Sequence, residues 1–197
     1  MESDPAKLRD GVRVAYSRAA SNPGGEHPFP VGEEFALSLG YPREALDTIP
    51  RTAIEAFAGV SNVSVFATVP AGGTVVDLGC GSGLDSLMAA QRVGAEGRVV
   101  GIDFSEEMLD RANFSLRELG WANVKFLRSF AEQLPLADAC VGQALVNGIF
   151  NLNPFRGEIF RELARIVKPG GSVFGAELVL RAPLQETSLA GAANWFS

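Results

Sequence analysis

T-V-V-D-L-G-C-G-S-G, residues 74–83, is a short apolar run that ends in an acidic residue and three glycines at alternate positions. The β-branched residues Val75 and Val76 favour a buried strand. The glycines permit backbone angles that other residues rarely adopt, so a ligand can approach the main chain closely. The stretch therefore predicts a strand that ends in a tight, nucleotide-cradling loop.

The sequence after this loop predicts a helix and then a second strand. Residues 84–93 read L-D-S-L-M-A-A-Q-R-V, a helix whose unpaired amides and positive dipole end face the loop. Residues 98–104 read R-V-V-G-I-D-F and contain Asp103, twenty residues beyond Gly83. A carboxylate at the tip of the second strand is well placed to hold both hydroxyl groups of a ribose.

The spacing of the glycines separates two classes of nucleotide ligand. Dinucleotide-binding folds favour G-x-G-x-x-G, whereas this loop reads D-x-G-x-G-x-G, with Asp77 at the end of the strand. A carboxylate beside the loop would repel an anionic pyrophosphate and attract the ammonium group of S-adenosylmethionine. The pattern favours S-adenosylmethionine over NAD; an NAD-type oxidoreductase stays an alternative that preferential binding of NAD would support.

The rest of the chain alternates helices and strands behind a helical N-terminal segment. A helix capped by Ser105 is expected to begin at Glu106 and end near Gly120. Further strands are expected at 124–130, 140–147 and 172–180, with a helix at 154–167 and N-terminal helices at 5–20, 33–39, 43–48 and 51–58. This order predicts an α/β fold with a doubly wound, mostly parallel Rossmann-like sheet and helices on both faces. We expect one domain over residues 1–197, with a helical N-terminal cap at 1–70 and the core at 71–197.

Four sequence blocks resemble class I S-adenosylmethionine-dependent methyltransferases. They are V-V-D-L-G-C-G-S-G at 75–83, G-I-D-F-S-E-E-M-L-D-R-A at 101–112, A-E-Q-L-P at 131–135 and R-E-L-A-R-I-V-K-P-G-G at 161–171. The resemblance runs roughly over residues 71–180. It implies an enzyme that uses S-adenosyl-L-methionine and releases S-adenosyl-L-homocysteine.

The resemblance also implies which residues contact this cofactor. Tyr16 would cover it, as a matching tyrosine does in similar enzymes. Many relatives carry Gly-Asp after the third strand to bind the adenine amine, but Ser129 and Phe130 stand there in this chain. Backbone groups and the Phe130 ring are therefore expected to contact the adenine. The expected cofactor-binding residues are Tyr16, Asp77, Gly79, Cys80, Gly81, Gly83, Asp103, Phe104, Met108, Phe130, Ala131 and Asn147.

Within this class, further blocks resemble arsenite methyltransferases. They are V-R-V-A-Y-S-R-A-A at 12–20, L-S-L-G-Y at 37–41 and V-N-G-I-F-N-L at 146–152. In that family cysteine thiolates hold trivalent arsenic, but here Gly148 and residues 22–27 stand where the family has cysteines. We therefore expect an arsenite-methyltransferase-like scaffold that lacks the family's cysteines, with an arsenite methyltransferase proper as an alternative.

Composition favours a small-molecule acceptor. The net charge is −6 and no block of lysine and arginine stands out to neutralise phosphates, so a nucleic-acid substrate is not expected. No run of the sequence has the length and apolarity of a membrane span, and charged residues interrupt any N-terminal signal, so we expect a cytoplasmic protein without a membrane partner. Cys80 and Cys140 lack C-x-x-C spacing, which predicts neither a metal site nor a disulfide.

The C-terminal segment is short for the family. Relatives usually continue beyond the fifth strand with an antiparallel strand pair, for which only residues 181–197 remain. We expect this pair to be missing. The open edge of the sheet would then favour a homodimer.

Few dedicated catalytic residues are expected. A sulfonium methyl group is transferred by in-line displacement, which requires mainly the alignment of the reactants in a dry pocket. If the acceptor needs a general base, the candidates are His27, Glu33 and Glu34, and no catalytic residue is assigned. A protein that binds the cofactor without turnover stays a second alternative.

Overall fold

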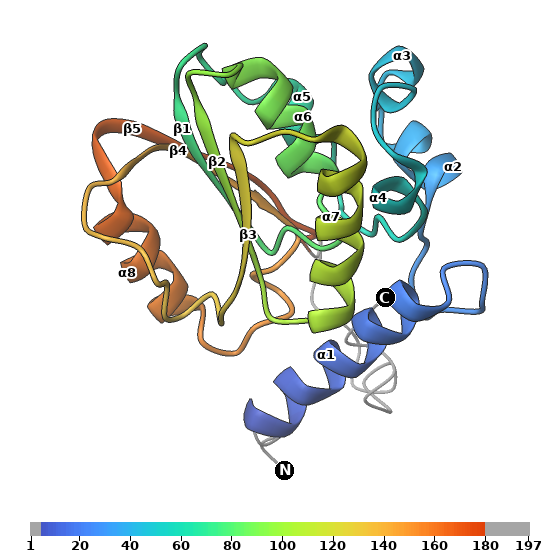
Figure 1. Cartoon of the computed structure of the whole chain (residues 1–197). Helices are drawn as coiled ribbons and strands as arrows, with labels where there is room; N and C mark the ends of the chain where they lie inside the picture. The colour runs from blue at the N-terminus through green and yellow to red at the C-terminus, as the bar shows by residue number, and fades with distance from the viewer. Residues whose placement is uncertain (1–4, 180–197) are drawn as a thin grey trace.

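The computed structural model describes residues 5–179, and a parallel β-sheet forms its centre (Figure 1). The strands are β1 (Thr74–Leu78), β2 (Arg98–Asp103), β3 (Val124–Arg128), β4 (Val141–Asn147) and β5 (Val167–Ala176). Their order across the sheet is β3-β2-β1-β4-β5, and all neighbouring pairs are parallel. The expected doubly wound α/β fold is confirmed.

The glycine loop leaves the carboxyl end of β1, where the strand order reverses. β2 and β3 follow on one side of β1, whereas β4 and β5 lie on the other. Val75, Val76 and Leu78 are fully buried, as expected for a central parallel strand that is covered on both faces. Because ligands of open α/β sheets bind at such a reversal, outside the carboxyl ends of the strands, the topology places a site at this loop.

Helices cover both faces of the sheet. In Figure 1, α6 (Leu84–Val93) and α7 (Glu106–Leu119) lie on one face and α8 (Arg156–Ile166) lies on the other. The hydroxyl of Ser105 accepts the backbone N–H of Met108 at 3.2 Å, and Gly120 ends α7 in the left-handed conformation. The expected cap and end of this helix are therefore confirmed.

The N-terminal segment is helical, as expected. It contains α1 (Pro5–Ser21), α2 (Glu33–Ser38), α3 (Arg43–Leu46), α4 (Arg51–Glu55) and α5 (Val63–Phe66). The last three are single turns or little more, and α5 was not expected, because V-S-V-F has no capping signal. Figure 1 shows α1 crossing the end of the sheet beside α7, away from α2 and α3.

The fifth strand begins earlier than expected. A helix was expected at 154–167 and a strand at 172–180, but Val167 is already extended and pairs with Val141. The Pro-Gly-Gly turn that follows interrupts the ladder, which resumes where Ser172 pairs with Gln143. The turn is thus an irregularity inside β5. Val167, a β-branched residue, precedes the turn and already pairs with the neighbouring strand.

β5 forms one edge of the sheet in the described residues, and Val173 on it is half-exposed. The expected absence of a strand pair beyond β5 concerns residues outside the described range. The homodimer stays a prediction, which light scattering can test. No helix in residues 5–179 is long and apolar enough to cross a bilayer.

Candidate cofactor site

The glycine loop has the backbone conformation that its sequence predicts. Gly79, Gly81 and Gly83 have positive φ angles of 76°, 51° and 95°. A Cβ atom on Gly79 would overlap the Ile149 side chain, and one on Gly83 would lie 3.0 Å from the Phe126 ring. Gly79 thus permits a close approach to the segment after β4, whereas Gly83 permits the packing of α6 against its neighbours.

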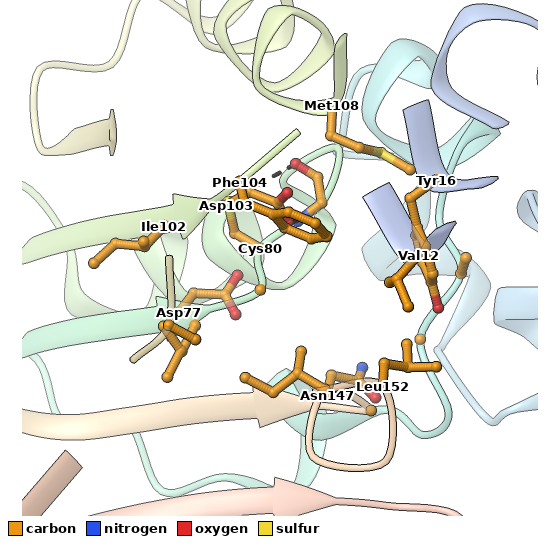
Figure 2. Close-up of a pocket in the computed structure, with 18 of the residues that line it drawn as sticks. Val12, Tyr16, Asp77, Cys80, Ile102, Asp103, Phe104, Met108, Asn147 and Leu152 are labelled. Carbon is orange, nitrogen blue, oxygen red and sulfur yellow. Dashed lines mark hydrogen bonds between the residues drawn. The ribbon is translucent and has the colours of Figure 1, made fainter. Parts of the chain in front are cut away.

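A pocket opens at this loop, over the carboxyl ends of β1, β2 and β4 (Figure 2). Its empty volume is about 970 Å³, including the part that is open to solvent. Every expected cofactor-binding residue lines the pocket except Gly83, whose surroundings are the packing contacts described above. The structure therefore brings together residues from the loop, three strand ends and α1.

Three buried carboxylates lie at the pocket, and none of them forms an ion pair with a described residue. Asp77, Asp85 and Asp103 are 2%, 6% and 7% exposed. Burial and the nearby Asp85 raise the pKa of Asp77 to about 8, although the Ser86 hydroxyl donates a hydrogen bond to it at 2.6 Å. Because a buried carboxylate without a cationic partner is costly, the site is electrostatically prepared for a cationic ligand group.

Asp103 is held by the backbone around it. Its two oxygens accept the N–H groups of Gly81 at 2.9 Å and Ser105 at 2.8 Å. Burial raises the pKa of this carboxyl, and these hydrogen bonds oppose the rise. Each oxygen keeps a further acceptor position, so Asp103 can orient the glycine loop and still bind a ligand hydroxyl.

Asn147 lies at the pocket, but its amide is used within the protein. Its oxygen accepts the backbone N–H groups of Val60 at 2.9 Å and Ser61 at 3.1 Å. Its nitrogen donates to the Ser61 carbonyl at 2.7 Å and to Asp85 at 2.8 Å. Tyr41 also donates to Asp85, at 2.7 Å. Asn147 therefore joins β4 to the segment before α5, and any contact with the cofactor would come from the rest of the residue.

Helix α1 forms a wall of the pocket. Arg9, Val12 and Tyr16 have the spacing of one helix face and all line the pocket. The Tyr16 ring stacks on Phe29 with a centroid distance of 4.5 Å. Burial, with smaller effects from Asp103 and Glu177, raises the pKa of Tyr16, so its hydroxyl stays neutral.

Arg9 fastens this wall to the segment after β3. Its guanidinium forms an ion pair with Glu132 at 2.6 Å and lies 4.1 Å from the centre of the Phe130 ring. Glu132 also accepts a hydrogen bond from the Asn153 amide at 3.1 Å. Three segments of the pocket rim, on α1, after β3 and before α8, therefore meet at Glu132.

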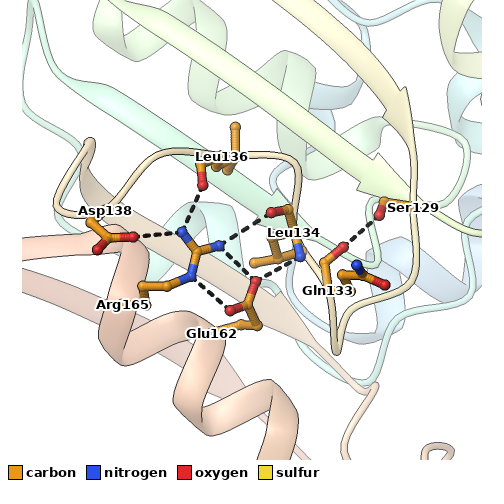
Figure 3. A network of polar contacts seen from close by, with 7 residues as sticks. All are labelled: Ser129, Gln133, Leu134, Leu136, Asp138, Glu162 and Arg165. Atoms are coloured by element: carbon orange, nitrogen blue, oxygen red, sulfur yellow. Dashed lines mark hydrogen bonds and ion pairs between the residues drawn. The ribbon is translucent and has the colours of Figure 1, made fainter.

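A polar network holds the segment after β3 in place from outside the pocket (Figure 3). Arg165 on α8 donates to the Leu136 carbonyl at 2.7 Å and forms ion pairs with Glu162 at 2.7 Å and Asp138 at 2.8 Å. Glu162 in turn accepts the Leu134 N–H at 2.7 Å. The network anchors the far end of the segment that supplies Phe130 and Glu132 to the pocket.

The three candidate bases do not line the pocket. His27 lies in the loop after α1, where its Nε2 is 2.9 Å from the Asn22 carbonyl oxygen. Glu33 forms ion pairs with Arg43 and Arg51 on the helical cap. Glu34 is also outside the pocket. Their side chains are therefore not among those that surround a ligand in the pocket.

The two cysteines of the chain differ in burial and lie at different ends of the sheet. Cys80 is buried in the glycine loop, where desolvation raises the pKa of its thiol, and Cys140 is exposed just before β4. Cys140 precedes the amino end of β4, whereas the pocket lies at the carboxyl ends of the strands. Cys140 is therefore at the opposite end of the sheet from the pocket. The two thiols cannot act together on one ligand.

Several pocket residues were not expected from the sequence. Those that matter most are Arg9, Val12, Asp85, Glu132, Ile149 and Leu152. The spacing of Arg9 and Val12 from Tyr16 was a usable signal, because it places the three on one helix face. Glu132, Ile149 and Leu152 lie on irregular segments, where no periodic pattern shows which side chains face the pocket.

Comparison with known proteins identifies the family of the chain. Residues 70–195 match the methyltransferase domain family. The chain is 30% identical over 199 residues to an arsenite methyltransferase from Halobacterium salinarum, covering 94% of this chain and 51% of that protein. It is 34% identical over 106 residues to a demethylmenaquinone methyltransferase from Listeria welshimeri, covering 53% of this chain and 44% of that protein. The chain thus spans about half the length of the curated relatives it matches.

A solved structure shows the same architecture. The crystal structure of an arsenic(III) S-adenosylmethionine methyltransferase from Chlamydomonas reinhardtii superimposes with a TM-score of 0.62 at 26% identity, over 81% of this chain and 55% of that chain. Fold, pocket and sequence agree: the chain belongs to the methyltransferase domain family and is similar to its class I S-adenosylmethionine-dependent members, among them arsenite methyltransferases.

Proposed function

We propose that this protein binds S-adenosyl-L-methionine and transfers its methyl group to a small-molecule acceptor by in-line displacement. The observation that carries the proposal is the pair of buried carboxylates, Asp77 and Asp103, beside a glycine loop at the reversal of the strand order. Neither has a cationic partner among the described residues. A ligand with an ammonium group, a sulfonium and a ribose would supply the missing charge and hydroxyl groups.

The chain's own residues bind and align the reactants. Asp77 would attract the ammonium group, Asp103 would accept from the ribose hydroxyls, and Phe104 and Phe130 would contact the adenine. When bound, S-adenosylmethionine supplies an electrophilic methyl group: the acceptor's lone pair forms the new bond to carbon while the old C–S electron pair stays on sulfur. Any proton on the acceptor leaves to water at the open side of the pocket or to a carboxylate that lines it, since His27, Glu33 and Glu34 lie outside.

The test is transfer of label from methyl-labelled S-adenosylmethionine. We expect a panel of small acceptors to include at least one that becomes labelled, with one S-adenosylhomocysteine formed for each methyl group transferred. Binding of S-adenosylhomocysteine without labelling of any acceptor would instead support a binding protein without turnover. Preferential thermal stabilisation by NAD would overturn the assignment in favour of an oxidoreductase.

Arsenite belongs in that panel because of the relatives described above. The geometry gives it less support, since the only thiol at the pocket is Cys80 and burial keeps it protonated. Trivalent arsenic prefers several soft sulfur ligands, which the described residues do not bring together. Formation of labelled methylarsenic from arsenite in the presence of a small thiol would nevertheless establish that the protein is an arsenite methyltransferase.

Cofactor binding should depend on pH through Asp77. Its pKa of about 8 means that Asp77 is protonated at neutral pH in the free protein, whereas the bound ammonium group favours the carboxylate. Binding should therefore release up to one proton and tighten by about tenfold per pH unit between pH 6 and pH 7.5. Calorimetry of S-adenosylhomocysteine binding in buffers of different ionisation enthalpy measures both effects, and pH-independent binding without proton release would contradict this assignment.

Breaking the contact between Arg9 and Glu132 should loosen the α1 wall. We expect Arg9→Met to raise the dissociation rate of S-adenosylhomocysteine by roughly three- to tenfold. This factor corresponds to the free energy of a partly exposed ion pair together with a cation–π contact. Arg13→Met is the matched control, because Arg13 on the same helix pairs only weakly with Asp10, at 3.6 Å. Stopped-flow displacement measures the rates. Equal rates for the two variants would show that Arg9 does not hold the wall against the pocket.

A further inference from the structure

The pocket has a second half that the carboxylates do not reach. In Figure 2, Val12, Tyr16 and Leu152 lie on the opposite side of the pocket from Asp77 and Asp103. Val12 and Tyr16 come from α1, and Leu152 comes from the segment after β4. We call this region the apolar half of the pocket. If the cofactor occupies the acidic half, the methyl acceptor must bind here.

The polar side chains around the apolar half are already engaged. The Asn153 amide donates to Glu132 at 3.1 Å and its oxygen accepts the Phe155 N–H at 2.8 Å. Arg9 is paired with Glu132, and the Asn147 amide is used by the neighbouring backbone. These groups have little capacity left for a new ligand.

Tyr16 is the exception. Among the hydrogen bonds of residues 5–179, none involves its hydroxyl, although the ring is packed against Phe29. Figure 2 shows the side chain extending into the pocket toward Leu152. Because burial and Asp103 keep the hydroxyl protonated, it can exchange one hydrogen bond with an uncharged polar atom but cannot act as a base.

The charges at the pocket select against an anionic acceptor. Asp77, Asp85, Asp103 and Glu132 all line it, and Arg9, the one cationic side chain among the described residues that line it, is paired with Glu132. An acceptor carboxylate or phosphate would meet this negative field in a partly desolvated site without a counter-charge. A neutral apolar molecule would instead be stabilised by burial against Val12, the Tyr16 ring and Leu152.

We propose that the apolar half of the pocket binds a neutral, largely apolar acceptor that has one hydroxyl or carbonyl oxygen, held by a hydrogen bond with the Tyr16 hydroxyl. This proposal rests on the proposed function and adds the class of its acceptor. The Tyr16 ring keeps its place as a wall over the cofactor, while its hydroxyl selects the acceptor. Acceptors that differ only in this oxygen should therefore differ in affinity.

The experiment uses three bicyclic probes of similar shape with protein saturated in S-adenosylhomocysteine. The probes are 2-naphthol, naphthalene and 2-naphthoate, and dissociation constants come from ligand-observed NMR. We expect 2-naphthol to bind roughly three- to tenfold more tightly than naphthalene, the value of one hydrogen bond, and 2-naphthoate to bind least. Binding of 2-naphthoate equal to or tighter than that of 2-naphthol would overturn the proposal.

Tyr16→Phe separates the hydroxyl from the ring. In this variant the advantage of 2-naphthol over naphthalene should disappear, while the affinity for naphthalene stays within about twofold, because the apolar wall is retained. An unchanged ratio of the two affinities would overturn the role of Tyr16. Leu152→Ala is the companion variant, and it should weaken 2-naphthol and naphthalene equally.

The affinity for S-adenosylhomocysteine is measured on the same samples. Failure of the folded protein to bind it would defeat the proposed function and this proposal together. Normal binding of S-adenosylhomocysteine with no preference for 2-naphthol would defeat only the acceptor class and leave methyl transfer standing.

Discussion

Asp77→Asn should make the free protein more stable and its cofactor binding much weaker. The substitution keeps the shape of the side chain and an oxygen that can accept from Ser86, but removes a buried carboxyl whose pKa is raised to about 8. Between about pH 4 and pH 8 the unfolded chain has this group ionised and the folded protein binds a proton, so the wild-type stability falls as pH rises through this window. Asparagine removes that dependence.

The expected sizes are large enough to measure separately. Stability at pH 7 should rise by about 1–3 kcal/mol in chemical denaturation, because folding of the wild-type chain has to bind a proton at Asp77 and folding of the variant does not. The affinity for S-adenosylhomocysteine should fall by about 100-fold, as for a buried partner of a charged group. Asp110→Asn on the exposed face of α7 is the control and should change neither quantity. An Asp77→Asn variant with wild-type affinity would show that this carboxylate does not hold the ammonium group.

Asp103→Ala should weaken cofactor binding by about 1.5–3 kcal/mol, the value of a hydrogen bond to a charged group. The measurement is calorimetry with S-adenosylhomocysteine. The substitution also acts on the free protein, because alanine leaves the Gly81 and Ser105 N–H groups of the glycine loop and the α7 cap without their acceptor. The affinity of the variant alone therefore does not prove a contact with the ribose.

A 2′-deoxy analogue of S-adenosylhomocysteine separates the two effects. Wild-type protein should bind the analogue more weakly than S-adenosylhomocysteine, whereas Asp103→Ala should bind the two with nearly equal affinity, since the partner of the missing hydroxyl is gone. If the analogue loses as much affinity in Asp103→Ala as in the wild type, Asp103 serves only to orient the glycine loop.

Local patterns predicted the core of the fold because they involve neighbouring residues. The β-branched pair before the glycines gave β1, and the serine cap and terminal glycine gave α7, whose bounds agree with the expectation. The start of β5 was missed because Val167 follows α8 directly and its pairing with Val141 depends on a strand 26 residues away. Tertiary pairing decided this boundary against the local Pro-Gly-Gly signal.

The part of the candidate site that lies at the strand ends was predictable from the sequence, whereas the contacts of the irregular segments were not. Asp77 and Asp103 end neighbouring parallel strands, so their convergence follows from the topology alone. The sequence did not reveal that the Asn147 amide would be used by the backbone of residues 60–61, or that Arg9 would meet Glu132 123 residues away. Such contacts depend on how irregular segments fold back on the sheet, for which no periodicity exists.

Titration calorimetry of the wild-type protein with S-adenosylmethionine and with NAD, at pH 7, tests the account most directly. We expect one saturable site for S-adenosylmethionine, a proton released on binding and no detectable heat from NAD. Folded protein that gives no heat with S-adenosylmethionine, or that binds NAD in its place, would contradict it.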